Sequence, residues 1–306
     1  MMKKIATREA YGKTLVSLGE LNPNIVVLDA DLSKSTKTAD FKSVNEDRFF
    51  NMGIAEQNLM GVAAGLATVG KVPFASTFAM FAAGRAFEII RNSICYPKLN
   101  VKVCATHAGL TVGEDGASHQ AIEDLAIMRS LPNMTVVNPA DGVSTDKLLR
   151  LVADFHGPAY VRLGRLAVDA CYDENATFEI GKGNTLRDGD DVTIIATGIM
   201  VAEAIKAAKM LEADGIGARV IDMHTLKPVD TDIIVKAAKE TGRIVTAEEH
   251  SVIGGLFSLV SETVAMHHPV PVRPIAVMDT FGESGNPAEL LIKYNLTAEA
   301  IYKAAK

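Results

Sequence analysis

Cysteines are few in this sequence, and their spacing suits neither a disulfide framework nor a metal site. The chain of 306 residues has three of them, Cys95, Cys104 and Cys171, and no C-x-x-C pair. Disulfide scaffolds and zinc sites use more cysteines at closer, paired spacings. A scarcity of cysteine is typical of proteins in a reducing compartment, so we expect a cytoplasmic protein.

An excess of basic charge, a long apolar run and an apolar leader segment are also missing. Lys and Arg number 31 against 37 Asp and Glu, which gives a formal net charge of −6 and no basic field for nucleic acid. No apolar run reaches the length of a membrane span. Polar residues begin at Thr7, after Lys4 and only two apolar residues, Ile5-Ala6, where a signal peptide would have its apolar segment. We therefore expect no nucleic-acid partner and no membrane partner.

Complete nucleotide-binding motifs are absent as well. The segment Gly12-Lys13-Thr14 ends like a phosphate loop, but Thr7 stands where the first glycine of that motif would be. The segment Gly181-Lys182-Gly183 begins like a dinucleotide loop, but Leu186 stands in place of the third glycine. Neither segment therefore predicts a nucleotide site.

Short apolar segments alternate with helical patterns along the chain, in two series separated by a polar, glycine-containing stretch. A length of 306 residues with 48% apolar residues suits two domains with buried cores. Strands separated by helices form parallel sheets covered on both faces. We predict an α/β protein of two doubly wound domains, each a mostly parallel sheet with helices on both faces. The expected boundaries are 1–168, a linker at 169–190, and 191–306.

One acid stands where a helix of small residues begins. Residues 53–61 read G-I-A-E-Q-N-L-M-G, with Glu56 at the centre. An acid is favoured at a helix N-terminus, but a carboxylate beside a packed apolar segment is costly unless another group meets it. Local sequence therefore leaves two interpretations of Glu56, a first-turn acid that stabilises the helix or a functional carboxylate.

Ligands of open parallel sheets bind beyond the carboxyl ends of the strands, and one loop at such an end is rich in reactive side chains. Residues 106–120 read T-H-A-G-L-T-V-G-E-D-G-A-S-H-Q. They include His107, Glu114, Asp115 and His119, without a metal-ligand spacing. This combination suits hydrogen bonding to a polyhydroxylated substrate and proton transfer at its oxygens. We expect a helix of about 119–129 after the loop, and one long helix over 79–94 before it.

Several segments, taken together and in order, resemble the carboxyl-terminal half of the transketolases, which are thiamine diphosphate enzymes. They are A-T-R-E-A (6–10), D-A-D-L-S-K-S (29–35), G-I-A-E-Q (53–57), S-T-F-A-M-F (76–81), the 106–120 loop and R-S-L-P-N-M-T-V-V-N-P-A-D (129–141). The family's G-D-G motif for the diphosphate and Mg²⁺ is missing, and Gly189-Asp190-Asp191 in the expected linker is the nearest sequence. The resemblance therefore implies one subunit of a split transketolase, with an N-terminal partner subunit that holds the diphosphate and Mg²⁺. It also implies self-association.

The resemblance assigns roles to residues of the cofactor side. Glu56 would hydrogen-bond the pyrimidine N1′ of thiamine diphosphate and favour the imino tautomer, which takes the proton from the thiazolium C2. Phe78 and Phe81 would stack against the pyrimidine, although both would be ordinary core residues on local evidence. Asp31 would lie near the cofactor, on the thiazolium side or through a neighbouring loop.

On the substrate side, the resemblance implies binding of phosphosugars and transfer of a two-carbon ketol unit between them. Asp115 would bind a substrate hydroxyl, and His107 and His119 would serve substrate oxygens and proton transfer. The sugar phosphate would be held by Arg8, Ser35 and Arg162, with Arg165 as a close competitor of Arg162. Arginine suits this role because its guanidinium donates several hydrogen bonds in a fixed geometry.

Three other interpretations stay open at this point. A deoxyxylulose-phosphate synthase belongs to the same superfamily but usually has an acid and an Arg where Thr106 and His107 stand here. A beta subunit of a 2-oxo-acid dehydrogenase shares the two domains and the acid, but not the G-E-D-G-A-S-H-Q loop. A non-catalytic regulatory or scaffolding subunit would have no need of the intact Glu56, His107, Asp115 and His119.

Overall fold

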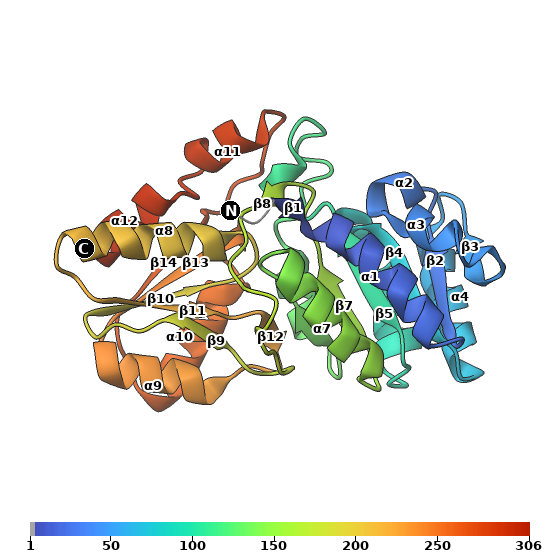
Figure 1. Ribbon diagram of the computed structural model, residues 1–306, viewed down its shortest axis with the longest axis horizontal. Coiled ribbons are helices and arrows are strands. Elements are labelled where there is room, and N and C mark those ends of the chain that lie inside the picture. The colour runs from blue at the N-terminus through green and yellow to red at the C-terminus, as the bar shows by residue number, and fades with distance from the viewer. Residues whose placement is uncertain (1–3) are drawn as a thin grey trace.

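Two sheets, each covered by helices, form two lobes that lie side by side (Figure 1). The computed structural model describes residues 4–306. The first lobe contains a seven-stranded sheet in the order β12-β6-β7-β5-β4-β2-β3, and the second a five-stranded sheet in the order β14-β13-β10-β11-β9. The predicted α/β class with mostly parallel sheets is therefore confirmed.

The seven-stranded sheet is parallel except at one edge. Its strands are β2 (Ile25–Asp29), β3 (Phe49–Asn51), β4 (Val72–Phe78), β5 (Lys102–Thr106), β6 (Thr135–Val137), β7 (Ala159–Arg162) and β12 (Thr225–Lys227). The exception is β12, which pairs antiparallel with β6. This strand comes from the C-terminal half of the chain, so that half completes the sheet of the first lobe.

Alternating side chains of the strands give the first lobe two apolar layers. In β2, Ile25 and Val27 pack in one cluster with α1 and α7, while Val26 and Leu28 pack in the other with α4, because successive strand residues point to opposite faces. The helices of this lobe are α1 (Thr7–Leu21), α2 (Ser33–Thr36), α3 (Thr38–Lys42), η1 (Glu46–Arg48), α4 (Glu56–Thr68), η2 (Phe81–Arg85), α5 (Phe87–Ile89), η3 (Ile90–Cys95), η4 (Leu110–Val112), α6 (Asp124–Ser130) and α7 (Gly142–Asp154).

The second lobe repeats the layered arrangement around a smaller sheet. Its strands are β9 (Asn184–Arg187), β10 (Val192–Ala196), β11 (Ala218–Asp222), β13 (Ile244–Ser251) and β14 (Val272–Val277), and only β9 is antiparallel to its neighbour. Its helices are α8 (Met200–Ala213), α9 (Thr231–Thr241), α10 (Leu256–His267), α11 (Pro287–Lys293) and α12 (Ala298–Ala305). A short antiparallel pair, β1 (Ile5–Ala6) with β8 (Ala167–Val168), joins the two ends of the first lobe.

Three expectations about local structure need correction. The segment expected to be a linker, 169–190, contains β9 of the second sheet. The helix expected over 79–94 contains two π-helical segments, η2 and η3. The helix expected from about 119 begins only at Asp124, because the backbone of Ala121 is engaged in a bridge to Ala108 and accepts a hydrogen bond from Gly109. The positions of the domain boundaries stay a prediction.

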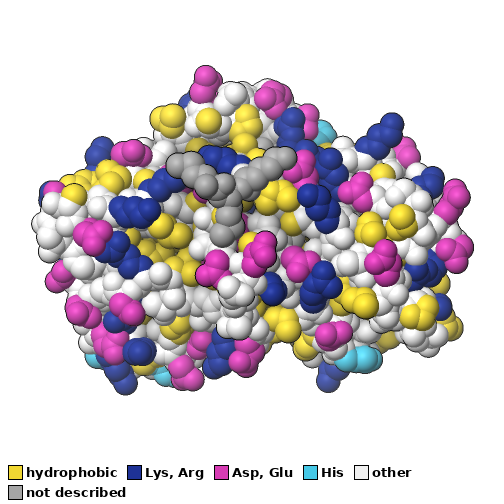
Figure 2. Space-filling view, viewed as in Figure 1, with side chains coloured by type: hydrophobic (Ala, Val, Ile, Leu, Met, Phe, Trp, Pro, Cys, Tyr) yellow, Lys and Arg dark blue, Asp and Glu magenta, His cyan; other side chains and the backbone are white. Residues whose placement is uncertain are grey.

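The molecular surface carries charges of both signs. Figure 2 shows Lys and Arg side chains interspersed with Asp and Glu side chains over the face that carries α1 and α7. Among the described residues, every helix is too short or too polar to cross a lipid bilayer.

Candidate active site at the carboxyl edge of the first sheet

The strand ends of the first sheet bring together side chains that lie far apart in the sequence. Because β2, β4 and β5 are parallel neighbours, their carboxyl ends meet at one edge. Asp31 follows β2, Phe78 ends β4 and His107 follows β5. Residues predicted to bind the cofactor and the loop predicted to bind substrate therefore lie at the same edge of the sheet.

Four aromatic rings form the centre of this site. The ring of Phe78 stacks on that of His107 with 3.9 Å between centroids, and on that of Phe81 with 5.8 Å. His119 meets the edge of Phe81 at 5.4 Å. Phe78 and Phe81, which local sequence could not distinguish from core residues, thus separate the loop of His107 and His119 from the helix that carries Glu56.

Glu56 begins α4 and is 5% exposed. Its Oε1 accepts a hydrogen bond from Nη1 of Arg85 at 3.0 Å, and the same guanidinium lies over the ring of Phe81 at 4.5 Å. The buried charge that made Glu56 conspicuous in the sequence is therefore met by a cation. The sequence analysis missed Arg85. This residue could have been found from its spacing of four residues from Phe81, which places both side chains on one face of a helix.

His107 is a neutral imidazole with a defined tautomer. Its Nε2 lies 3.2 Å from Nη1 of Arg8 and its Nδ1 lies 2.9 Å from Oγ1 of Thr106. Because an arginine only donates, Nε2 accepts and the proton is assigned to Nδ1, which donates to Thr106. Burial, then the charges of Arg8 and Arg165, lower the pKa of His107 to about 3.

Two arginines, Arg8 and Arg165, make a corner of positive potential beside the neutral His107. Nη1 of Arg8 also donates to the backbone oxygen of Ser35 at 2.9 Å, and burial and the charge of Arg165 lower the pKa of Arg8. Arg165 donates to the carbonyl of Val112 and to Oε2 of the exposed Glu114 at 3.0 Å. Two neighbouring cations that share no carboxylate between them are a physical indication of an anion site.

Arg162, expected to hold a phosphate, lies elsewhere. Its guanidinium is 4% exposed and pairs with Asp124, with Nε 2.9 Å from Oδ2. Its Nη2 donates to the carbonyls of Ala121 and Glu249 at 3.1 and 3.0 Å. The expected phosphate role of Arg162 is therefore corrected. Strand β7 aims this side chain into the contact between the lobes, and Arg165, three residues later, is the arginine beside Arg8 and His107.

The remaining predicted residues are found at the rim of the site. Asp31 is exposed, has a φ of 64°, and accepts a hydrogen bond from Nδ2 of Asn51 at 2.9 Å. Asp115 is exposed near the tip of the loop. His119 is half-buried, with Nδ1 2.9 Å from Oγ of Ser118. These polar groups surround the aromatic centre, as a site for a polar substrate requires.

The described residues suit the flat ring of a thiamine cofactor. A buried carboxylate, linked through Arg85 to the ring of Phe81, suits a flat, nitrogen-containing ring, which it can hold by a hydrogen bond. No group of three His, Cys, Asp or Glu within 4–306 is arranged to hold a metal ion.

Two family models match nearly the whole chain. The transketolase pyrimidine-binding domain matches residues 3–170, and the transketolase C-terminal domain matches residues 181–301. The chain belongs to the transketolase family. The family resemblance inferred from the sequence motifs is therefore confirmed, and the two models meet within the stretch expected to separate the domains.

Relatives of similar length are parts of split transketolases. A transketolase C-terminal section from Methanocaldococcus jannaschii is 54% identical over 97% of this chain and 94% of its own. One of the subunits of the apulose-4-phosphate transketolase of Phocaeicola vulgatus is 43% identical over 98% and 96%. The structure titled "Split gene transketolase, inactive beta4 tetramer" is 63% identical, with a TM-score of 0.93 over 98% of this chain and 97% of that one. The chain thus corresponds to the C-terminal subunit of a split transketolase, and to 49% of the human enzyme's length.

Proposed function

We propose that this chain supplies the pyrimidine-binding half of a thiamine-diphosphate-dependent transketolase, which moves a two-carbon ketol unit from a ketose phosphate to an aldose phosphate. The observation that carries the proposal is the position of Glu56, a buried carboxylate at the start of α4 that pairs with Arg85, whose guanidinium lies over the ring of Phe81. In this proposal the diphosphate and Mg²⁺ are held by an N-terminal subunit, and the reaction takes place between the two chains.

On the cofactor side, Glu56 binds the pyrimidine N1′ and favours the imino form of the neighbouring amine. Phe78 and Phe81 cover the ring and exclude water, which strengthens a hydrogen bond to a charged carboxylate. Arg85 has to leave Oε1 of Glu56, or share the carboxylate, when the ring binds. The bound cofactor supplies a stabilised carbanion equivalent. Asp31 lies at the rim, where it can approach the thiazolium side.

On the substrate side, Arg8 and Arg165 bind the phosphate, together with His107 and the segment of Ser35. Support comes from the unfavourable proximity of the two arginine charges, which a phosphate would relieve. His107 is neutral and donates from Nδ1 to Thr106 in this structure, so it is suited to hydrogen bonding and not to carrying a charge. Asp115 and His119 serve the sugar hydroxyls and proton transfer at its oxygens.

This chain offers a surface near Glu56 on which the partner subunit can bind. A Cβ built at Gly61 or at Gly65 of α4 meets no described atom within 4 Å, so this face of the helix is open. Both glycines lie on the exposed side of the helix that Glu56 begins. We propose that the N-terminal subunit covers this face and completes the cofactor site. The relative titled an inactive beta4 tetramer supports self-association and the need for a second kind of subunit.

We propose a cytoplasmic location and a reaction on sugars of the pentose phosphate type. The relatives act on different sugars by name, 6-deoxy-6-sulfo-D-fructose in one case and apulose 4-phosphate in another. The acceptor therefore has to be determined by assay, with pentose phosphates tried first.

The test is reconstitution with the partner. Proteins that co-purify with this chain from its native cell are identified by mass spectrometry, and one of roughly domain size with G-D-G and a later Asn is expected. Thiamine diphosphate with Mg²⁺ is then titrated calorimetrically into each chain and into the mixture, and ketol transfer is assayed. We expect binding and transfer only in the mixture. Cofactor binding by the mixture without ketol transfer to any sugar phosphate would overturn the proposal.

A further inference from the structure

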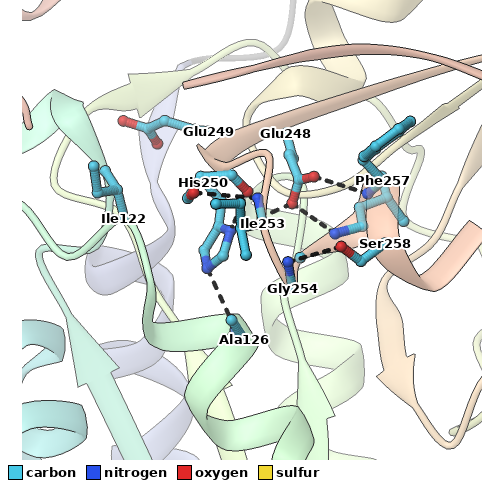
Figure 3. A network of polar contacts seen from close by, with 12 residues as sticks. Ile122, Ala126, Glu248, Glu249, His250, Ile253, Gly254, Phe257 and Ser258 are labelled. Carbon is cyan, nitrogen blue, oxygen red and sulfur yellow. Dashed lines mark hydrogen bonds and ion pairs between the residues drawn. The ribbon is translucent and has the colours of Figure 1, made fainter. Parts of the chain in front are cut away.

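The end of β13, in the second lobe, is built from three consecutive buried residues that could ionise. Glu248, Glu249 and His250 are all at most 3% exposed. Figure 3 shows Glu248 and His250 directed toward α10 and α6, and Glu249 directed away from them, as the alternation of a strand requires. Consecutive side chains therefore serve different parts of the molecule.

Glu249 reaches the loop that carries the predicted substrate residues. Its Oε1 accepts a hydrogen bond from the backbone N–H of Thr111 at 2.6 Å, across 138 positions of sequence. Gly109, with a φ of 81°, lies directly against the same carboxylate, and a Cβ built there would be 2.2 Å from Cδ of Glu249. A carboxylate of the second lobe thus fits closely against the first half of the loop.

This contact continues to the proposed phosphate ligand. Thr111 and Val112 belong to one turn of 3-10 helix, and the carbonyl of Val112 accepts from the guanidinium of Arg165. The turn therefore connects Glu249 to Arg165 by two hydrogen bonds and one peptide unit. Arg162 secures the far end of the loop, since its Nη2 donates to both Ala121 and the backbone oxygen of Glu249.

We propose that Glu249 is a positioning residue for substrate, through which the second lobe fixes the 107–121 loop and the phosphate-binding Arg165. The proposal rests on the proposed transketolase function, because it assigns Arg165 to the sugar phosphate. Removal of the Glu249 carboxylate leaves the N–H of Thr111 without its acceptor and opens space under Gly109. The turn and Arg165 then lose a fixed position relative to Arg8 and His107.

Glu248 provides a matched control on the same strand. It is as deeply buried as Glu249, and its two oxygens accept from the N–H groups of Leu256 and Phe257 at 2.6 and 2.8 Å (Figure 3). These donors are at the start of α10, so Glu248 stabilises a helix and has no hydrogen bond to the loop. A purely structural role for Glu249 would make the two glutamates behave alike.

The experiment compares Glu249→Ala with Glu248→Ala in the reconstituted complex. We expect Glu249→Ala to raise KM for a phosphorylated acceptor about tenfold, while KM for its unphosphorylated analogue and kcat change by less than about threefold. Glu248→Ala is expected to lower the melting temperature with KM unchanged. Glu249→Gln keeps an acceptor for Thr111 and should restore most of the affinity. Equal changes of KM in the two alanine variants, or none in Glu249→Ala, would overturn the proposal.

Hydrogen exchange gives a readout that needs no activity, so the proposal can be judged even if the transketolase function fails. Peptides of 107–121 should exchange faster in Glu249→Ala, and the first turn of α10 should exchange faster in Glu248→Ala. If Glu249→Ala does not fold, Glu249→Asp, which keeps the charge and shortens the reach by one methylene, takes its place. Unchanged exchange over 107–121 in the folded variant would contradict the inference.

Discussion

The two lobes have the same architecture but use the carboxyl edges of their sheets in opposite ways. At the edge of the first sheet, Asp31, Asp115 and Arg165 are exposed, or partly so, and can reach a ligand. At the edge of the second sheet Asp222, Glu249 and His250 are buried, and desolvation raises the pKa of Asp222 to about 8 and that of Glu249 to about 7. The buried groups at the carboxyl edge of the second sheet bind other segments of the protein.

The difference shows that position at a strand end does not by itself make a site. Strand ends favour polar groups in both lobes, because the backbone leaves the sheet there. Whether these groups bind substrate depends on what packs against them. The second lobe turns its edge toward the first, so Glu249 and His250 meet a loop and a helix of the neighbouring lobe.

The sharpest test of this comparison is removal of the charge of Glu56. Glu56→Gln should lower turnover of the reconstituted enzyme by about 10²–10⁴-fold, because a proton-transfer partner of the cofactor is lost, with the melting temperature nearly unchanged. Steady-state kinetics and thermal unfolding measure the two quantities. Glu88→Gln, an exposed acid on the adjacent helical segment, is the control and should retain activity. Full turnover in Glu56→Gln would show that the carboxyl edge of the first sheet is not the active site.

Substitution of Arg162 removes one ion pair and two hydrogen bonds near the contact between the lobes. Arg162→Met leaves Asp124 buried without its cation, which should lower the free energy of unfolding by about 3–5 kcal/mol. Denaturant unfolding measures it. The double variant Arg162→Met with Asp124→Leu should recover part of the loss. The exposed pair of Arg150 with Asp146 is the control, since Arg150→Met should cost less than about 1 kcal/mol. A small loss for Arg162→Met would mean that the other contacts between the lobes, such as those of Glu249 and His250, are sufficient to hold them together.

A smaller effect is expected from Arg165, which tests whether the edge of the first sheet binds the phosphate of the substrate. Arg165→Ala should raise KM for phosphorylated acceptors about tenfold, because one charge-assisted contact to phosphate is lost. Unphosphorylated acceptors should be affected by less than about twofold. Arg187, in an ion pair with Glu212 in the second lobe, provides a control substitution with no expected effect on KM. Equal effects on both kinds of acceptor would place the phosphate elsewhere.

The smallest expected effect is a change in acid stability at His107. Since its pKa is lowered to about 3 in the folded protein, the unfolded chain binds a proton that the folded one does not as pH falls below about 6.5. Between pH 7 and 5.5 this costs about 1 kcal/mol of stability. His107→Gln should lose less stability over that interval, as measured by urea unfolding. His267→Gln, at an exposed position, should follow the parent protein, and an unchanged slope for His107→Gln would contradict the assignment.

Local pattern was sufficient for most of the fold. The predicted alternation of short apolar segments with helical patterns is found in both lobes, and the apolar run Ile25–Asp29 is a buried parallel strand, because such runs have little alternative in an α/β chain. Strands β9 and β12 were missed because neither is a long apolar run. They belong to their sheets through tertiary pairing, which sequence periodicity does not record.

The site was predictable in its residue types but not in all its contacts. Glu56, His107 and His119 stood out because charged or polar groups occurred beside glycines and at expected strand ends. Arg162 and Arg165 could not be ranked, because side chains three residues apart in an extended segment and the turn after it differ in direction, which composition does not reveal. The partnership of Arg85 with Glu56 depends on the packing of two helical segments.

Strand β12 has a consequence for the modularity of the molecule. Since this strand from the C-terminal half covers the edge of β6, a fragment cut between residues 170 and 181, where the two family models part, would expose unpaired N–H and C=O groups along that edge. Open edges of this kind recruit other strands and favour aggregation. The family models describe two modules, but protein engineers who wish to exchange one of them would have to transplant β12 with the first.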